Sequence, residues 1–396
     1  MLEIDQDVLI VGASAAGLCT AEALRREGHR GRLTLMDAEP LHPYDRPPLS
    51  KQLLAGTWDA SRVYLRTEAE LEALGAEWAL DEQAVHLETS ARSVRTATGR
   101  LFSADAVVLA TGLVPRRLGG FEDVRGLHVL RSLNDALALH ARLQGGGVRL
   151  VVVGNGVMGS EVAATAAGMG VEVTLVGRSS LPMASQLGDF GSSLLAAKHV
   201  AAGVRLIGAQ GVQDITVCEG EVRGVVLLSG EFLPADDVVV AIGSRPNIDW
   251  LAHSGLNREN GIGCDARCRA APGIWAVGDV ARWHHPRLGD IRLENRTNAA
   301  EQAIAVASDI LGAGQPYAPV PYFWSDQYGV KIQVHGSIPA GARMTITDGE
   351  PNTDRFVAVA DSSEGAHPTG VLGWNMPKQT RLRRMELEEV LAPAFP

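Results

Sequence analysis

Two glycine-rich turns are the residues in this sequence best suited to chemistry, because each follows a short apolar run and opens an alanine-rich segment. The first reads DVLIVGASAAG and the second LVVVGNGVMGSE. Their glycines are Gly12 and Gly17 in the first turn, and Gly154, Gly156 and Gly159 in the second. The first glycine permits a tight turn, the middle one lets the backbone approach a pyrophosphate, and the last lets a helix pack close to its strand. Each turn therefore predicts a site for dinucleotide phosphates, although Ser14 replaces the middle glycine in the first.

The second turn lacks the carboxylate that such a site usually carries at the end of its next strand. In VTLVGRSS, residues 173–180, Gly177 stands at the expected acid position and is followed by Arg178 and Ser179. A carboxylate there would bind ribose hydroxyls and repel a 2′-phosphate, whereas an arginine fork can bind that phosphate. The pattern predicts NADPH ahead of NADH, with use of both nucleotides left open. The alternative is a solvated loop that contains an arginine by chance.

Each turn must be held by a strand before it, a helix after it and a second strand beyond, and the sequence offers both units. Three further apolar runs end near a glycine or an acid, in ADAVVLATG at Gly112, DDVVVAIG at Gly243 and GIWAVGD at Asp279. Ligands of open α/β sheets lie beyond the carboxyl ends of the strands, so these ends are expected to face the cofactors.

The fold class predicted from these features is α/β, with two Rossmann-like dinucleotide-binding domains and a C-terminal α+β domain. The change to strand-like alternation rich in aromatic residues and prolines marks the start of the third domain. The expected boundaries are 1–113 with 242–318 for a discontinuous first domain, 114–241 for the second and 319–396 for the third.

Composition limits the classes of function. The chain has 396 residues, 46% hydrophobic and 21% charged, with a formal net charge of −10, which describes a globular protein and argues against sequence-independent nucleic-acid binding. No apolar stretch reaches the roughly 18 to 20 residues that span a bilayer, and no basic segment precedes a long apolar run, so a cytoplasmic protein is expected. Cys264 and Cys268 are read as strand cysteines rather than as a metal site.

Two dinucleotide folds in one chain indicate two dinucleotides, and the economical chemistry is a hydride passed from a nicotinamide to a flavin. Six further segments resemble the FAD-dependent ferredoxin reductases of the oxygenase-coupled type, which have the pyridine nucleotide-disulfide oxidoreductase fold. They are PYDRPPLSK (43–51), ATG (110–112), VLRSLNDA (129–136), AVGDVARW (276–283), ENRTNAAEQA (294–303) and YFWSDQYGVKIQ (322–333). The resemblance implies that NAD(P)H reduces FAD, and that single electrons pass to an iron-sulfur ferredoxin that supplies a cytochrome P450 or a Rieske oxygenase.

The same resemblance implies that the first domain holds FAD and the second NAD(P)H. At the FAD pyrophosphate it places Gly12, Ser14, Ala16 and Gly17. By the same resemblance, either Asp37 or Glu39 binds the adenosine ribose of FAD, and the sequence alone does not show which of the two it is. Val85 matches backbone at the adenine, Asp279 matches a contact of the ribityl chain, and Arg296 matches backbone at the flavin ring. The other implied cofactor contacts are Arg46, Ala110, Thr111, Gly112, Arg131, Gly154, Gly156, Met158, Gly159, Glu161, Arg178, Ser179 and Gly243.

Three residues are implied in catalysis. A cation at Lys51, beside flavin N5, would stabilise negative charge on the reduced ring, and Glu161 would hold that ammonium in place. The alternative is a solvated lysine after a proline turn. Trp324 would lie at the edge of the isoalloxazine and shape the exit route for single electrons, although an aromatic residue in an apolar segment is more often part of the core.

Electrons must pass from the flavin to their acceptor without a cysteine relay. The stretch PLHPYDRPPLSKQLLAG contains no cysteine, and His42 stands where some related oxidases and disulfide reductases need one. Ferredoxins are usually acidic, and a basic patch on the reductase would speed their encounter. The candidate patch is Lys378, Arg381, Arg383 and Arg384. The alternative is a solvated helix face with its own salt bridges.

Two other functions stay open at this point. One is an NAD(P)H oxidase or diaphorase with oxygen or a quinone as acceptor. The other is a redox-sensing interaction protein similar to apoptosis-inducing factor. Rapid oxygen consumption without ferredoxin would favour the first, and a long-lived charge-transfer band with little turnover would favour the second.

Overall fold

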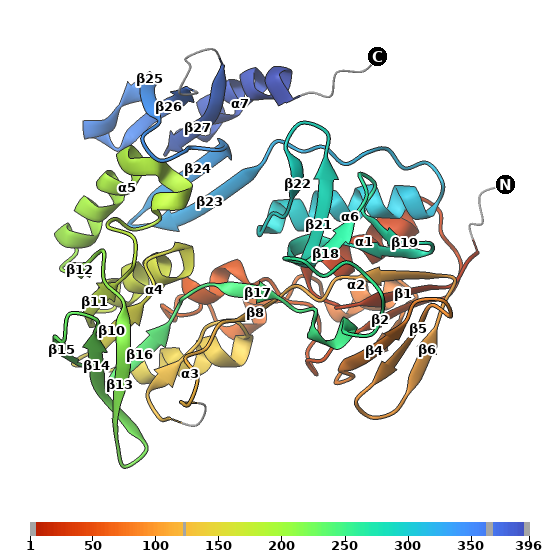
Figure 1. The fold of residues 1–396 in the computed structure, drawn as a ribbon, viewed down its shortest axis with the longest axis horizontal. Helices are drawn as coiled ribbons and strands as arrows, with labels where there is room; N and C mark the ends of the chain where they lie inside the picture. Colours follow the sequence, from red (N-terminus) through yellow and green to blue (C-terminus); the bar gives the residue numbers. More distant parts are fainter. Residues whose placement is uncertain (1–4, 122–123, 362–366, 392–396) are drawn as a thin grey trace.

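The fold is seen in a computed structural model, which describes residues 5–121, 124–361 and 367–391. Two parallel sheets lie side by side and a third, antiparallel sheet lies next to the second (Figure 1). This arrangement confirms the predicted fold class of two α/β domains with a C-terminal α+β domain.

The first sheet has β1 near its centre, parallel to both of its neighbours. Its strands, in spatial order, are β19 (Arg269–Ala271), β20 (Ile274–Ala276), β7 (Ala106–Leu109), β1 (Val8–Val11), β2 (Leu33–Met36) and β3 (Glu77–Ala79). Only β19 and β20 pair antiparallel. Four of its strands lie within residues 8–109 and the other two within residues 269–276. The sheet is therefore built from two separate stretches of chain.

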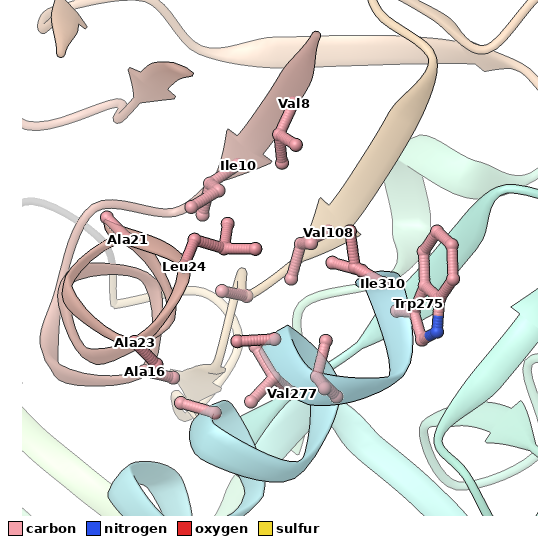
Figure 2. Packing of buried hydrophobic residues seen from close by; sticks show 14 of the residues in the cluster. Val8, Ile10, Ala16, Ala21, Ala23, Leu24, Val108, Trp275, Val277 and Ile310 are labelled. Carbon is pink, nitrogen blue, oxygen red and sulfur yellow. The ribbon is translucent and has the colours of Figure 1, made fainter. Parts of the chain in front are cut away.

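Both faces of the first sheet are covered, which explains its continuous apolar strands. Val8 and Ile10 join a core with helices α1 (Ala15–Arg26) and α6 (Arg296–Ile310). Figure 2 shows this core, with Val8, Ile10 and Val108 of the sheet close to Ala21 and Leu24 of α1 and to Ile310 of α6. Leu9 and Val11 join the opposite core, which includes an antiparallel meander. Its strands are β4 (Ala84–Glu88), β5 (Ser93–Thr96) and β6 (Leu101–Ser103).

The second sheet repeats this plan. Its parallel strands, in spatial order, are β12 (Arg205–Ile207), β11 (Glu172–Val176), β10 (Arg149–Val153), β16 (Asp237–Val240) and β9 (Leu127–His128). Helices α3 (Leu133–Leu143) and α4 (Val157–Gly168) share a core with one face. The meander β13 (Val212–Cys218), β14 (Glu221–Leu227) and β15 (Phe232–Pro234) covers the other.

The third sheet is antiparallel and lies between two helices. Its strands, in spatial order, are β23 (Tyr322–Gln327), β24 (Val330–Gly336), β27 (Pro368–Trp374), β26 (Arg355–Asp361) and β25 (Arg343–Glu350). One face packs on α5 (Ala184–Ala201) and the other on α7 (Pro377–Leu391) (Figure 1).

Shorter elements connect these layers. The pair β8 (Leu113–Pro115) and β17 (Ser244–Pro246) forms the two crossings between the parallel sheets (Figure 1). The remaining elements are α2 (Glu68–Ala73), β18 (Ile262–Cys264), β21 (Ala281–His285) and β22 (Gly289–Ile291), with 3-10 turns at Pro47–Ser50, Ala60–Val63, Asp249–Leu251, Gly278–Val280 and Pro351–Thr353. Within the residues described, none of the helices combines the length and the apolar character that crossing a membrane requires.

Candidate active site

The first glycine turn joins β1 to α1 and leaves no room for a side chain at Gly12 or Gly17. Gly12 has a φ of +107°, and a Cβ there would lie 2.3 Å from the carbonyl oxygen of Ala110. A Cβ on Gly17 would lie 1.9 Å from the carbonyl oxygen of Gly12. Ser14 is the N-cap of α1, but its side chain makes no capping hydrogen bond. The amino end of α1 therefore points backbone N–H groups at the turn without a side-chain cap, which suits a phosphate.

The two candidate acids, Asp37 and Glu39, both line a small cavity beside this turn. Ala13 N donates to Asp37 Oδ2 at 2.7 Å, and Glu39 N donates to Asp37 Oδ1 at 2.9 Å. Burial raises the pKa of Asp37, against the lowering effect of these backbone N–H groups. Glu39 instead accepts from Tyr44 Oη at 2.6 Å and from Arg46 Nη2 at 2.8 Å. Asp37 thus holds the turn, while Glu39 holds the Tyr44 and Arg46 side chains.

Three half-buried charged side chains, those of Arg46, Arg131 and Asp279, lie near the carboxyl ends of β7 and β20. Arg46 Nη1 donates to the carbonyl oxygen of Arg131 at 2.6 Å, and Arg131 Nη2 lies 3.1 Å from the position of a Cβ on Gly112. Burial lowers the pKa of Arg131 to about 10, and burial raises the pKa of Asp279 to about 6. The two arginines and one acid are thus held in a partly desolvated place, which suits a bound anion and hydroxyl groups.

Two other residues implied at FAD contacts are anchored differently. Arg296 begins α6, and its Nε donates to Asp45 Oδ1 at 3.0 Å. Val85 is exposed and lies at a register shift between Ala84 and His86, so it has no paired residue on strand β5. Its backbone is therefore outside the ladder of β4 and β5, but no interaction of its side chain joins it to the turn within the described residues.

The second glycine turn joins β10 to α4 in the same way. Gly154 has a φ of +112°, and a Cβ there would lie 2.2 Å from the carbonyl oxygen of Ala241. A Cβ on Gly159 would lie 1.7 Å from the carbonyl oxygen of Gly154. Gly156 is the N-cap of α4 and faces open space, and Met158 in the first turn of that helix is exposed. The amino end of α4 is thus open to a ligand.

The remaining predicted nucleotide residues lie at the ends of neighbouring strands. Arg178 and Ser179 follow β11 and are exposed, and no described carboxylate forms an ion pair with Arg178. Gly243 follows β16 with a φ of +92° and open space where a Cβ would stand. Thr111, after β7, donates from Oγ1 to the carbonyl oxygen of Asn247 at 2.9 Å. All of these residues lie at the carboxyl edges of the two parallel sheets.

Lys51 and Glu161 form a nearly buried ion pair between the first and second domains. Lys51 Nζ donates to Glu161 Oε2 at 2.7 Å and to the carbonyl oxygen of Pro47 at 3.0 Å. The side chain of Lys51 is 10% exposed and that of Glu161 is 5% exposed. Lys51 Nζ also lies 5.1 Å from the centroid of the Trp324 ring. The structure therefore brings together the three residues that were implied in catalysis, and Lys51 is not a solvated lysine.

Two serines that sequence reasoning missed complete this network. Ser50 Oγ donates to Glu161 Oε2 at 2.6 Å, and Ser325 Oγ donates to Glu161 Oε1 at 2.6 Å. Gln327 Nε2 in turn donates to Ser325 Oγ at 3.0 Å. The carboxylate thus ties together the turn at 47–51, helix α4 and strand β23 of the third sheet. Ser50 lies in the segment RPPLSK and Ser325 in the segment FWSDQ, far apart in the sequence, and only the fold makes them neighbours.

Comparison with known protein families shows which family contains a chain with these two glycine turns. The family model described as pyridine nucleotide-disulphide oxidoreductase matches residues 6–303, which is more than half of the chain. The chain belongs to this family. A second model, described as reductase C-terminal, matches residues 322–394. The pyridine nucleotide-disulphide oxidoreductases use FAD and a pyridine nucleotide, which fits the two glycine turns of this chain.

Within the pyridine nucleotide-disulphide oxidoreductases, the chain is similar to ferredoxin reductases of oxygenase systems. Rhodocoxin reductase of Rhodococcus erythropolis is 33% identical over 392 residues, covering 98% of this chain and 90% of that protein. The ferredoxin-NAD(+) reductase component of the p-cumate 2,3-dioxygenase system of Pseudomonas putida is 34% identical over 352 residues, covering 88% and 85%. The crystal structure of the covalent putidaredoxin reductase-putidaredoxin complex superposes with a TM-score of 0.91 at 30% identity, covering 98% and 94%.

Despite the family name, none of the four cysteines is among the described hydrogen-bond or ring partners of Lys51 and Glu161. All four cysteines are free. Burial raises the pKa of both Cys264, on β18, and Cys268, so neither thiol is activated. In the part of the chain that the structure describes, no three His, Cys, Asp or Glu side chains gather closely enough to hold a metal ion.

The basic residues of α7 divide into two kinds. Arg383 Nε pairs with Asp348 at 3.1 Å and its Nη1 with Glu386 at 2.9 Å, and Arg384 pairs with Glu388 at 2.9 Å. Lys378 and Arg381 are exposed, and no described acid pairs with either. The helix therefore carries its own salt bridges on one part and two unpaired cations on another.

Proposed function

We propose that this protein is an FAD-dependent NAD(P)H:ferredoxin reductase that prefers NADPH and supplies electrons to an oxygenase through an iron-sulfur ferredoxin. The observation that carries the proposal is the nearly buried ion pair between Lys51, which follows the 3-10 turn at Pro47–Ser50, and Glu161 on helix α4. The relatives named for ferredoxins and for a dioxygenase system support the acceptor.

FAD, when bound, accepts a hydride as two electrons and can release them singly. We assign residues 1–113 and 242–318 to its binding, and we assign residues 114–241 to NAD(P)H. In this proposal the Gly12 turn and the group of Arg46, Arg131 and Asp279 hold the anionic and hydroxyl groups of FAD.

The residues nearest the chemistry act by charge and position. Lys51 is held on the carboxylate of Glu161, so its ammonium stays oriented in a place with little water and stabilises negative charge that develops nearby. Trp324 is half-buried and lies beside this ammonium, which supports a position at the edge of the flavin rather than in the core. The third sheet contributes Ser325, which donates one further hydrogen bond to the same carboxylate.

NADPH is expected to give a kcat/KM about 10-fold or more above that of NADH, because Gly177 offers no charge to repel a 2′-phosphate and Arg178 can bind it. The Arg178→Ala variant is expected to lose most of this preference while it keeps its rate with NADH. The measurement is steady-state turnover with a ferredoxin acceptor at several concentrations of each nucleotide. Equal or better use of NADH by the wild type would contradict the preference.

Ferredoxin is expected to dock near the unpaired cations of α7. Reversing both charges, in Lys378→Glu with Arg381→Glu, is expected to raise the KM for ferredoxin by about 10-fold at low ionic strength, with little change at high salt. Arg384→Gln is the matched control, because Glu388 already neutralises that arginine. Ferricyanide reduction should be unaffected in all variants. If the KM for ferredoxin changed neither with the charge reversal nor with ionic strength, the docking surface would have to lie elsewhere on the protein.

A further inference from the structure

The side chain of Asn155 occupies the place that a side chain at position 177 would need. A Cβ added to Gly177 would lie 1.9 Å from Asn155 Cγ, 2.1 Å from its Oδ1 and 2.4 Å from its Nδ2. Gly177 is buried and Asn155, the residue between the first two glycines of the second turn, is half-buried. The missing carboxylate has therefore not left an open space, because an amide fills it.

The amide of Asn155 is also tied to the loop that follows. Its Nδ2 donates to the carbonyl oxygen of Ser179 at 2.7 Å and to that of Leu181 at 3.3 Å. The backbone adds a third link, from Met183 N to the carbonyl oxygen of Asn155 at 2.8 Å. One side chain of the turn thus fixes the course of the loop on which Arg178 and Ser179 are exposed.

The first turn shows the opposite arrangement at equivalent positions. Asp37 follows β2 as Gly177 follows β11, and Ala13 follows Gly12 as Asn155 follows Gly154. In the first unit the acid comes from the end of the strand and reaches the turn, where Ala13 N donates to it at 2.7 Å. In the second unit the polar side chain comes from the turn and lies over the end of the strand. The small residue is therefore in the turn in the first unit, as Ala13, and at the end of the strand in the second, as Gly177.

We propose that Asn155 is a specificity-determining residue for the nucleotide, a role that rests on the proposed use of NADPH. Its carboxamide takes the place of the ribose-binding carboxylate with a group that carries no charge. The amide oxygen can accept a hydrogen bond from a ribose hydroxyl, and it does not repel a 2′-phosphate. The two Nδ2 hydrogen bonds hold the loop so that Arg178 and Ser179 stay available for that phosphate.

This arrangement couples positions 155 and 177. A carboxylate introduced at 177 alone must displace the Asn155 amide and break its hydrogen bonds to Ser179 and Leu181. A carboxylate introduced together with a small residue at 155 has the space of the amide to itself. The pair, rather than Gly177 alone, therefore decides which nucleotide is bound.

The test compares four holoenzymes: wild type, Asn155→Ala, Gly177→Asp and the double variant. Dissociation constants for NADP⁺ and NAD⁺, together with kcat/KM for NADPH and NADH, are measured for each. Gly177→Asp alone is expected to weaken NADP⁺ binding about 30-fold and to improve NAD⁺ binding less than about threefold. The double variant is expected to bind NAD⁺ about 10-fold more tightly than the single Gly177→Asp variant. The flavin absorbance and the melting temperature of each variant report whether it is folded.

Asn155→Asp gives a second test at nearly constant shape. A carboxylate cannot donate to the carbonyl oxygens of Ser179 and Leu181, and its charge repels a 2′-phosphate, so NADP⁺ binding is expected to fall about 10-fold more than NAD⁺ binding. Equal losses for both nucleotides would overturn the specificity role.

The outcomes separate this inference from the proposed function. A wild type that prefers NADPH, with Gly177→Asp and the double variant gaining NAD⁺ affinity equally, would overturn the role of Asn155 and leave the function standing. A wild type that prefers NADH would overturn the proposed preference and this inference with it. A larger gain in the double variant of an NADPH-preferring enzyme supports both.

Discussion

The Glu161→Leu variant is expected to reduce its FAD with NADPH about 100-fold more slowly than the wild type, and to melt at a clearly lower temperature. Glu161 accepts hydrogen bonds from Ser50, Lys51 and Ser325, so its loss leaves the Lys51 ammonium nearly buried without a counter-charge. Breaking such a pair by removing one partner costs about 3–5 kcal/mol of stability. Stopped-flow absorbance of the flavin gives the rate, and thermal unfolding gives the stability.

A second substitution separates stability from rate. In the Lys51→Met, Glu161→Leu double variant no unpaired charge is buried, so most of the lost melting temperature is expected to return. Flavin reduction should stay slow, because the oriented ammonium is absent. Ser325→Ala is the matched control, since it removes one of the three donors to Glu161 and should cost about 1 kcal/mol with a small effect on the rate. A fast double variant would show that the pair is structural only.

The architecture was predictable because its signals are local. A glycine that needs a positive φ, such as Gly12 or Gly154, stands between an apolar strand and a helix, and that pattern can be read along the chain. The order of strands in the third sheet could not be read in this way. Its neighbours β24 and β27 are separated by more than thirty residues, and no short turn between them marks the pairing in the sequence. They lie side by side in the folded chain (Figure 1).

The site was predictable only as separate segments. Lys51 and Glu161 were implied by motifs, but Ser325 joins them through a contact between residues 164 positions apart. The coupling of Asn155 to Gly177 was equally hidden, because the sequence shows an absent acid but not the amide that fills its place. Such contacts join residues that are far apart in the chain. A single sequence does not show which distant residues become neighbours when the chain folds.

The Gly12→Ala and Gly154→Ala variants are expected to lose different cofactors. A Cβ at Gly12 would lie 2.3 Å from backbone at Ala110, with a φ of +107°, so the first turn cannot keep its shape and the protein should be isolated with little FAD. A Cβ at Gly154 meets the same obstacle at Ala241, with 2.2 Å and a φ of +112°. That variant should keep its FAD and bind NADPH about 30-fold more weakly, because only the second turn is distorted. Flavin absorbance after purification and equilibrium titration with NADP⁺ measure the two effects.

Gly156→Ala provides the control that tells distortion from lost contact. A Cβ at Gly156 meets nothing within 4 Å in the protein and its φ is −76°, so the fold tolerates the methyl group. Any loss of NADPH binding in this variant must therefore come from the methyl group standing between the turn and the pyrophosphate. Dithionite should still reduce the flavin of both second-turn variants at the wild-type rate, since it needs no nucleotide site. A Gly154→Ala protein that loses FAD, or a Gly12→Ala protein that keeps it, would reverse the assignment of the two turns.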